Sequence, residues 1–277
     1  GSDYVFGGIG DINGDGTPDL VWQTNGTLVT WLGGSSSTTQ TGPTPENVRL
    51  LESEVLPSYL SRRRWFASKD QKLKAVRLAA LTTIPDAGFA FTEVEADVGS
   101  HTERYVLPLG ITWGADTTVP LFMQLALARV RRGRNIGHLT DAFALPQFAH
   151  GVLKKVREHA TVPTVQKSEI RFVPTARFDE LEDIGETAEI RWLAAEQSNS
   201  SLIVAERVVL KLVRRVVGGV HPEAEMSRYL TEIGYANTAP LYGEVVRVDP
   251  EGVPHTLVLL QGFIENQGDA WNWALDY

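Results

Sequence analysis

The chain has 277 residues, a formal net charge of −8 at pH 7, 43% hydrophobic residues and no cysteine. The acidic balance argues against a nucleic-acid partner, and the lack of cysteine excludes disulfides and thiolate metal sites. No apolar run approaches the ~20 residues that span a bilayer, so we expect no membrane partner. The length predicts one to three domains at roughly 150 residues each.

The first segment, residues 3–34, is rich in glycine and shows no helical periodicity. Its loop at residues 11–19 alternates oxygen-bearing side chains with others, which suits a Ca²⁺ ion and its six to eight oxygen ligands. The expected ligands are Asp11, Asn13, Asp15, Asp19 and the carbonyl of Thr17. An EF-hand is excluded because Trp22 stands where that loop needs Glu. The alternative is a carboxylate-rich turn without metal.

A β-hairpin is expected next, with strands at 20–24 and 27–31 joined by Asn25-Gly26, a favoured two-residue turn. Loop and hairpin together resemble one FG-GAP/VCBS-type repeat, a calcium-binding blade of a β-propeller. A single blade leaves its faces uncovered, because propellers need several. We therefore expect a separate all-β blade that self-associates, packs on a partner, or is a graft or fragment.

A flexible linker is predicted at residues 35–49, because 33–45 contain no apolar side chain outside proline. A short helix should end near Leu60. Alternation of apolar residues predicts strands at 105–113 and 121–127 and a weaker one around 89–91. Phe148, Val152 and Val156 recur at helical spacing. Residues 50–165 therefore read as a small α+β unit.

The elements of the remaining chain are expected as strands at 169–173, 188–194, 202–204, 208–213, 243–248 and 256–260, with a helix after Pro222 and another from 269. The helix after Pro222 should carry Met226, Tyr229, Leu230 and Ile233 on one face. Lys211 lies on an apolar strand, where its ammonium needs a partner. A strand Lys, a helix Glu and a nearby loop of small polar residues position phosphates in kinases. The alternative is a snorkelling edge-strand lysine.

Several segments resemble the N-lobe of bacterial maltokinases: EQSNSS at 196–201, VLKLVRR at 209–215, HPEAE at 221–225, GYANTAP at 234–240 and LQGFI at 260–264. Residues 56–69 are similar to the start of the maltokinase N-terminal cap. Maltokinases have an aminoglycoside-phosphotransferase-like fold and make maltose 1-phosphate from maltose and ATP. The resemblance implies a cap at 50–165, an N-lobe at 166–262 and the start of a C-lobe at 263–277, an α+β architecture overall.

The resemblance also implies roles for particular residues. The phosphate loop would comprise Gln197, Ser198, Asn199, Ser200 and Ser201. Lys211 would contact ATP phosphates, with Glu225 as its helix partner and Glu223 as the second candidate. Gln261 to Phe263 would form the adenine hinge. The implied cofactor is Mg-ATP, the partners a nucleotide and a sugar, and the location cytoplasmic, with no prediction for the blade. Arg214 and Arg215 are expected at a solvated strand end.

No histidine is followed by Gly-Asp, and no Asp-Phe-Glu-like metal segment occurs. The resemblance places both elements in the C-lobe, so we expect a fragment, excerpted, engineered or naturally fused, that is not a competent kinase alone. A glucosamine-kinase-like relative stays open, because the acceptor is chosen in that lobe. A different class also stays open, namely a calcium-dependent assembly module that carries the kinase-like part as a passenger.

Overall fold

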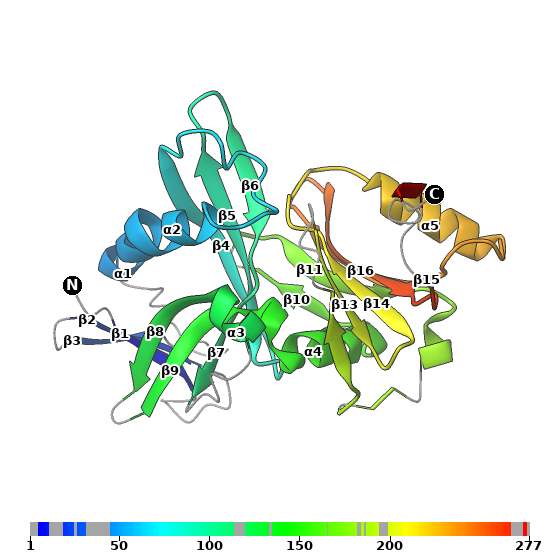
Figure 1. Cartoon of the computed structure of the whole chain (residues 1–277), viewed down its shortest axis with the longest axis horizontal. Coiled ribbons are helices and arrows are strands. Elements are labelled where there is room, and N and C mark those ends of the chain that lie inside the picture. Colours follow the sequence, from blue (N-terminus) through cyan, green and yellow to red (C-terminus); the bar gives the residue numbers. More distant parts are fainter. Residues whose placement is uncertain are drawn as a thin grey trace.

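The computed structural model describes residues 5–10, 19–24, 27–31, 45–113, 120–132, 135–164, 166–181, 184–185, 187–193, 199–266 and 274–275. Within them, two β-sheets lie beside each other, with helix α4 (Pro146–Arg157) between their inner faces (Figure 1). The first sheet is formed by strands before residue 142, and the second by strands after residue 160.

The strands of the first sheet are ordered β3-β2-β1-β8-β9-β7-β5-β4, with β6 paired to β5. They are β1 Val5–Gly10, β2 Asp19–Thr24, β3 Thr27–Trp31, β4 Ala75–Ile84, β5 Phe89–Asp97, β6 Thr102–Val106, β7 Leu109–Trp113, β8 Ala126–Arg132 and β9 Asn135–Asp141. The helices of this half are α1 Pro45–Leu50, the π-turn η1 Leu51–Val55, α2 Leu56–Leu60, α3 Pro120–Leu125, η2 Ala142–Ala144 and α4.

The second sheet has the order β10-β11-β15-β16-β14-β13-β12. Its strands are β10 Thr161–Pro163, β11 Glu169–Pro174, β12 Ile190–Trp192, β13 Ser200–Val204, β14 Val208–Leu212, β15 Leu241–Val248 and β16 Pro254–Gly262. The turn η3 Phe178–Leu181 precedes β12, and helix α5 Pro222–Glu232 crosses the outer face. Because β10 already pairs with β11, this sheet begins before the boundary expected at residue 165.

The N-terminal hairpin is present, with Thr24 of β2 opposite Thr27 of β3. It does not stand apart, however. Strand β1 pairs in parallel with β8, with Phe6 opposite Val130, so these strands extend the first sheet. The expectation of a separate unit is corrected on this point, since an open strand edge such as β8 is a ready template for further pairing. The expected linker is also shorter at its end, because α1 begins at Pro45, a residue suited to a first helical turn.

Two predicted strands differ from the structure. The segment 121–127 begins as helix α3, in which Phe122 and Leu125 are buried three positions apart and Met123 is 49% exposed. Period-two and helical patterns cannot be told apart over so few residues. The strand predicted at 105–113 is divided into β6 and β7, because Pro108 between them has no N–H for a ladder.

The apolar face predicted for α5 is also wrong. Met226, Tyr229 and Ile233 are each 58% exposed, whereas the side chains that α5 buries are those of Ala224 and Thr231. Small residues on the buried face let the helix lie close to the sheet. The hydroxyl of Thr231 accepts a hydrogen bond of 2.8 Å from the backbone N–H of Leu241, which ties α5 to β15.

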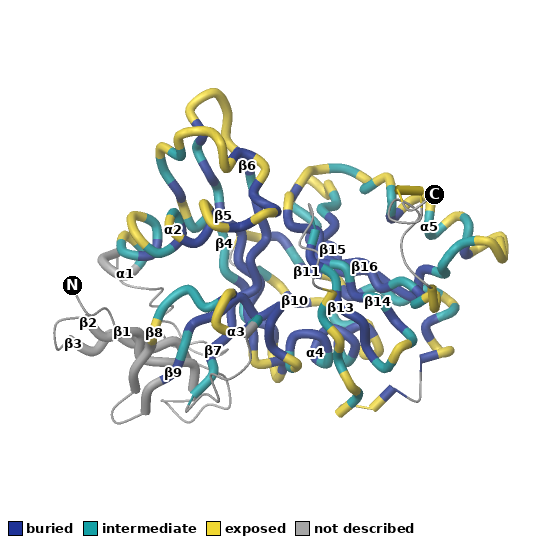
Figure 2. The backbone as a smooth tube through the Cα atoms, in the orientation of Figure 1, coloured by how far each residue is buried: buried dark blue, intermediate teal, exposed yellow. Residues whose placement is uncertain are grey.

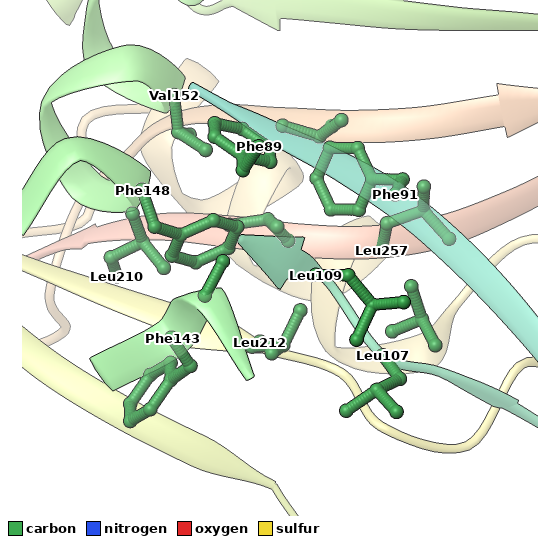
Figure 3. Packing of buried hydrophobic residues seen from close by; sticks show 14 of the residues in the cluster. Phe89, Phe91, Leu107, Leu109, Phe143, Phe148, Val152, Leu210, Leu212 and Leu257 are labelled. Carbon is green, nitrogen blue, oxygen red and sulfur yellow. The ribbon is translucent and has the colours of Figure 1, made fainter. Parts of the chain in front are cut away.

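One continuous core joins the two sheets through α4, and this helix lies where the spacing of its apolar residues predicted it. Phe148, Val152 and Val156 have no exposed surface, and the rings of Phe148 and Phe89 lie 4.9 Å apart. Figure 3 shows this cluster receiving side chains from β5 and β7 of the first sheet and from β14 and β16 of the second. The buried stretch at the centre of Figure 2 is the same core. The two halves therefore fold against each other as a single body.

A methyl group added to this core should be destabilising. At Gly151 of α4 it would lie 2.9 Å from Cβ of Ala87 and 3.0 Å from Cε1 of Phe89. Despite the better helix propensity of alanine, we expect Gly151→Ala to lower the free energy of unfolding by about 1–2 kcal/mol in urea melts. Gly185→Ala is the control, because a methyl there meets nothing within 4 Å. Equal stability of both variants would contradict the packing described here.

Candidate nucleotide-phosphate site

Lys211 lies in the middle of the second sheet, on the face covered by α5. It stands in register with Ser201 of β13 and Leu259 of β16, so these three share a face. Its neighbours Leu210 and Leu212 point the other way and are fully buried in the shared core. The alternation of a strand therefore places one charged side chain on the outer face while the apolar residues beside it hold the strand in the core.

The ammonium of Lys211 donates to both carboxylate oxygens of Glu223, at 2.8 Å and 2.6 Å. Glu223 also accepts a hydrogen bond of 3.3 Å from the side-chain amide of Gln261, and that amide lies 3.3 Å from Oγ of Ser227. The Lys211 and Glu223 side chains are 23% and 33% exposed, so a ligand can reach the pair.

The helix partner of Lys211 is therefore Glu223, and the assignment to Glu225 was wrong. Successive helix residues are about 100° apart, so Glu225 points away from Lys211 when Glu223 points toward it. Glu225 lines a cavity on another face of α5.

The predicted phosphate loop ends at strand β13, which pairs with the strand that carries Lys211. Asn199 precedes β13, and Ser201 lies beside Lys211. Gln197 and Ser198 lie outside the described residues. The side chain of Ser200 does not suit a phosphate, because it is buried and its hydroxyl accepts a hydrogen bond of 2.9 Å from Nε of Arg214.

The hinge predicted at residues 261–263 has its backbone donors engaged. The N–H of Gly262 donates to the carbonyl of Pro240 and the N–H of Phe263 to the carbonyl of Arg207, each at 2.8 Å. The side chain of Gln261 belongs to the Lys211–Glu223 cluster instead. Gln261 thus contributes through its side chain, a role that its place in the sequence did not indicate.

The expectation of a solvated Arg214 was wrong. Its side chain has no exposed surface and lies 2.7 Å from Oδ2 of Asp141, a residue of the first sheet that the sequence did not single out. The guanidinium carbon also lies 4.8 Å from the ring centre of Trp65. Tyr59 donates a hydrogen bond of 3.0 Å to the same carboxylate oxygen, and burial together with Asp141 raises the pKa of Tyr59 well above its usual value.

Arg215, the next residue, is 54% exposed as expected, and it pairs at 3.2 Å with the buried carboxylate of Glu103 on β6. Tyr105 donates a hydrogen bond of 2.7 Å to the other oxygen of Glu103. Burial alone would raise the pKa of Glu103, but hydrogen bonds from Tyr105, Ser68 and His101 and the charge of Arg215 outweigh it and lower the pKa. The carboxylate form of Glu103 therefore stabilises the fold.

This pair predicts a pH dependence. A depressed pKa contributes stability above the unfolded value of about 4.3, and that stability is lost as the pH falls through the folded value. Glu103→Gln should be less stable than the wild type at pH 7, and the difference should shrink as the pH is lowered from about 5 to about 3. Thermal melts across this range, with Glu251→Gln on an exposed turn as control, measure it. A difference that does not change with pH would contradict the assignment.

Among the described residues, no three His, Asp or Glu side chains gather in a way that could hold a metal ion. The predicted calcium ligands Asp11, Asn13, Asp15 and Thr17 lie outside the described residues, and Asp19 is the first residue of β2. The helices of the described chain include none that is long and apolar enough to cross a membrane.

Comparison with known proteins gives one domain match. Residues 59–144 match the family model of the maltokinase N-terminal cap domain. These residues run from the end of α2 to η2. They include Trp65 and Asp141, which contact Arg214, and Tyr59, which donates to Asp141.

Three solved structures of glucosamine kinase are similar in fold. One, in complex with glucosamine, ADP and inorganic phosphate, has a TM-score of 0.47 and 16% identity, over 79% of this chain and 43% of that chain. Crystal form A has a TM-score of 0.46 and 16% identity, over 79% of this chain and 44% of that chain. Crystal form B has a TM-score of 0.43 and 17% identity, over 73% of this chain and 37% of that chain. The chain thus spans less than half the length of these kinases. Its residues 59–144 are similar to the maltokinase N-terminal cap domain.

Proposed function

We propose that this chain carries the nucleotide-phosphate-binding part of an ATP-dependent sugar kinase of the maltokinase type, with maltose as the acceptor. The observation that carries the proposal is the accessible Lys211–Glu223 pair, with Ser201 in register beside the lysine. The match of residues 59–144 to the maltokinase cap supports the choice of acceptor. A glucosamine acceptor is the alternative.

The chemistry assigned to these residues is the positioning of phosphate. Two carboxylate contacts hold the ammonium of Lys211 at the outer face, where it remains a donor toward anionic oxygens. Gln261 holds Glu223 in place from β16. Mg-ATP would supply the phosphoryl group, and the sequence lacks the His-Gly-Asp and Asp-Phe-Glu-like segments that would carry the base and the metal carboxylates. The chain alone should therefore bind nucleotide without transferring phosphate, in a cytoplasmic setting where ATP is present.

Isothermal titration with ATP tests the binding. Saturable binding that weakens with added salt is expected, because a cation recognises the phosphates. No saturable binding at millimolar ATP would overturn the proposal. A coupled ATP-consumption assay with maltose tests the second part, and clear turnover would show that the catalytic groups are present after all.

Calcium binding by Asp11, Asn13, Asp15, Thr17 and Asp19 is proposed from their spacing alone. The test is titration with Ca²⁺ beside mass measurement with and without chelator. Tight binding lost in Asp15→Asn supports the site, and a chelator-sensitive oligomer would favour self-association through the N-terminal strands. A monomer with no affinity for calcium would mean that residues 11–19 form a carboxylate-rich turn without metal.

A further inference from the structure

The buried side chain of Arg214 connects the first sheet to strand β13 of the second. Its Nη2 atom lies 2.7 Å from Oδ2 of Asp141, and its Nε atom donates a hydrogen bond of 2.9 Å to Oγ of Ser200. Asp141 is the last residue of β9, and Ser200 is the first residue of β13. All three residues are buried, with at most 4% of their surface exposed. One guanidinium therefore holds the end of one strand and the beginning of the other.

The position of Arg214 is set by the first half of the chain. The central carbon of its guanidinium lies 4.8 Å from the ring centre of Trp65 and 5.5 Å from that of Phe143. The main chain is tied to the same half, because the carbonyl of Arg214 accepts a hydrogen bond of 2.8 Å from the N–H of Val106 on β6. The side chain is thus fixed between two buried rings and cannot follow Ser200 if β13 moves.

The two serines at the start of β13 face opposite sides of the second sheet. Ser200 points inward to Arg214, whereas Ser201 is partly exposed and stands in register with Lys211. Side chains alternate along a strand, so a bond that holds Ser200 inward also holds Ser201 outward beside the ammonium. A shift of one residue would exchange the two faces. The hydrogen bond from Arg214 therefore fixes which groups of β13 lie next to Lys211.

We propose that Arg214 is a positioning residue of the candidate phosphate site, and that through it the first sheet sets the affinity of the chain for nucleotide phosphates. The inference rests on the proposed function, because it takes the phosphates to lie beside Lys211. Arg214 has no exposed side-chain surface, so it acts through the hydroxyl of Ser200 and not by touching the nucleotide. A binding group that is held by a supporting hydrogen bond loses affinity when that bond is removed, even where the fold survives.

Ser200→Ala removes the acceptor of this bond and keeps the pair of Arg214 with Asp141. Titration calorimetry with ATP should show binding about three- to tenfold weaker than in the wild type. Ser200→Thr restores a hydroxyl and should bind within about twofold of the wild type. Urea melts of the same samples establish that each variant is folded during the titration. Wild-type affinity in Ser200→Ala would overturn the proposal.

Thr140→Val is the matched control for a buried hydroxyl. Thr140 has no exposed surface and donates a hydrogen bond of 2.9 Å to the carbonyl of Leu125. It precedes Asp141 on β9, so its side chain faces the other side of the first sheet. Thr140→Val should lose stability as Ser200→Ala does, but it should bind ATP as the wild type does. Equal weakening of ATP binding in both variants would mean a general structural effect and would also overturn the proposal.

Hydrogen exchange of β13 tests the positioning without nucleotide. In Ser200→Ala the amides of β13 should exchange at least about threefold faster than in the wild type, and in Thr140→Val they should exchange at the wild-type rate. Unchanged exchange in Ser200→Ala would overturn the role of Arg214, whatever the affinity for ATP. If the wild type binds no ATP, the proposed function fails, and faster exchange in Ser200→Ala would still assign the placement of β13 to Arg214.

Discussion

Replacing Arg214 with methionine is expected to lower the free energy of unfolding by about 3–5 kcal/mol, because the variant leaves a buried carboxylate without its cation. Neither Arg214 nor Asp141 has any exposed side-chain surface, and their nearest charged atoms are 2.7 Å apart. Water therefore cannot replace the lost partner. The second oxygen of Asp141 accepts the N–H of Phe143 at 3.1 Å, so the carboxylate also holds the turn after β9.

The stability lost in Arg214→Met should exceed what the lost packing of the arginine side chain alone explains. Methionine fills much of the volume of the arginine stem and can still pack on Trp65, so most of the effect should come from the stranded Asp141. Asp141→Asn/Arg214→Met removes both charges and should recover part of the stability lost in Arg214→Met. The measurement is a double-mutant cycle in urea, read by tryptophan fluorescence.

Arg215→Met serves as the control, because this neighbour is 54% exposed and its loss should cost no more than about 1 kcal/mol. Similar losses for Arg214→Met and Arg215→Met would contradict the buried pair. A double variant less stable than either single variant would mean that Asp141 acts chiefly through Tyr59 and Phe143.

Lys211 and Arg214 show what the sequence can and cannot predict. Lys211 interrupts an otherwise apolar strand, so its own neighbours signal that a charge faces outward and needs a partner. Arg214 comes just after that strand, where local pattern cannot distinguish a solvated end from a buried contact. Its partner Asp141 is on the first sheet and becomes a neighbour only when the sheets pack. Long-range pairing of this kind leaves no periodic signal in one sequence.

The elements themselves were predictable where periodicity ran long enough. Helix α4 and strands β5, β11, β14 and β16 lie where apolar spacing placed them. Helix α3 was mistaken for a strand because six residues cover less than two helical turns. The start of α5 at Pro222 was predicted, but the choice between Glu223 and Glu225 also required the orientation of this helix relative to β14.

The Lys211–Glu223 pair leads to a second prediction with a large effect. Lys211→Met is expected to lower the affinity for ATP about ten- to a hundredfold. A charged hydrogen bond to phosphate contributes about 1.5–3 kcal/mol, and methionine keeps the stem but has no charge. Stability should change by less than about 1 kcal/mol, because the pair with Glu223 is partly exposed. Titration calorimetry with ATP and urea melts on the same samples separate the two effects.

Glu223 and Glu225 of α5 provide the matched comparison. Glu223→Gln removes the charge that holds the Lys211 ammonium but keeps an oxygen that can accept one hydrogen bond, so a smaller loss of about three- to tenfold is expected. Glu225→Gln should leave ATP affinity unchanged, because its side chain lines the opposite cavity. If Glu225→Gln weakened ATP binding more than Glu223→Gln, the pairing of Lys211 would have to change on nucleotide binding. If Lys211→Met bound ATP as the wild type does, the phosphates would lie elsewhere on the chain.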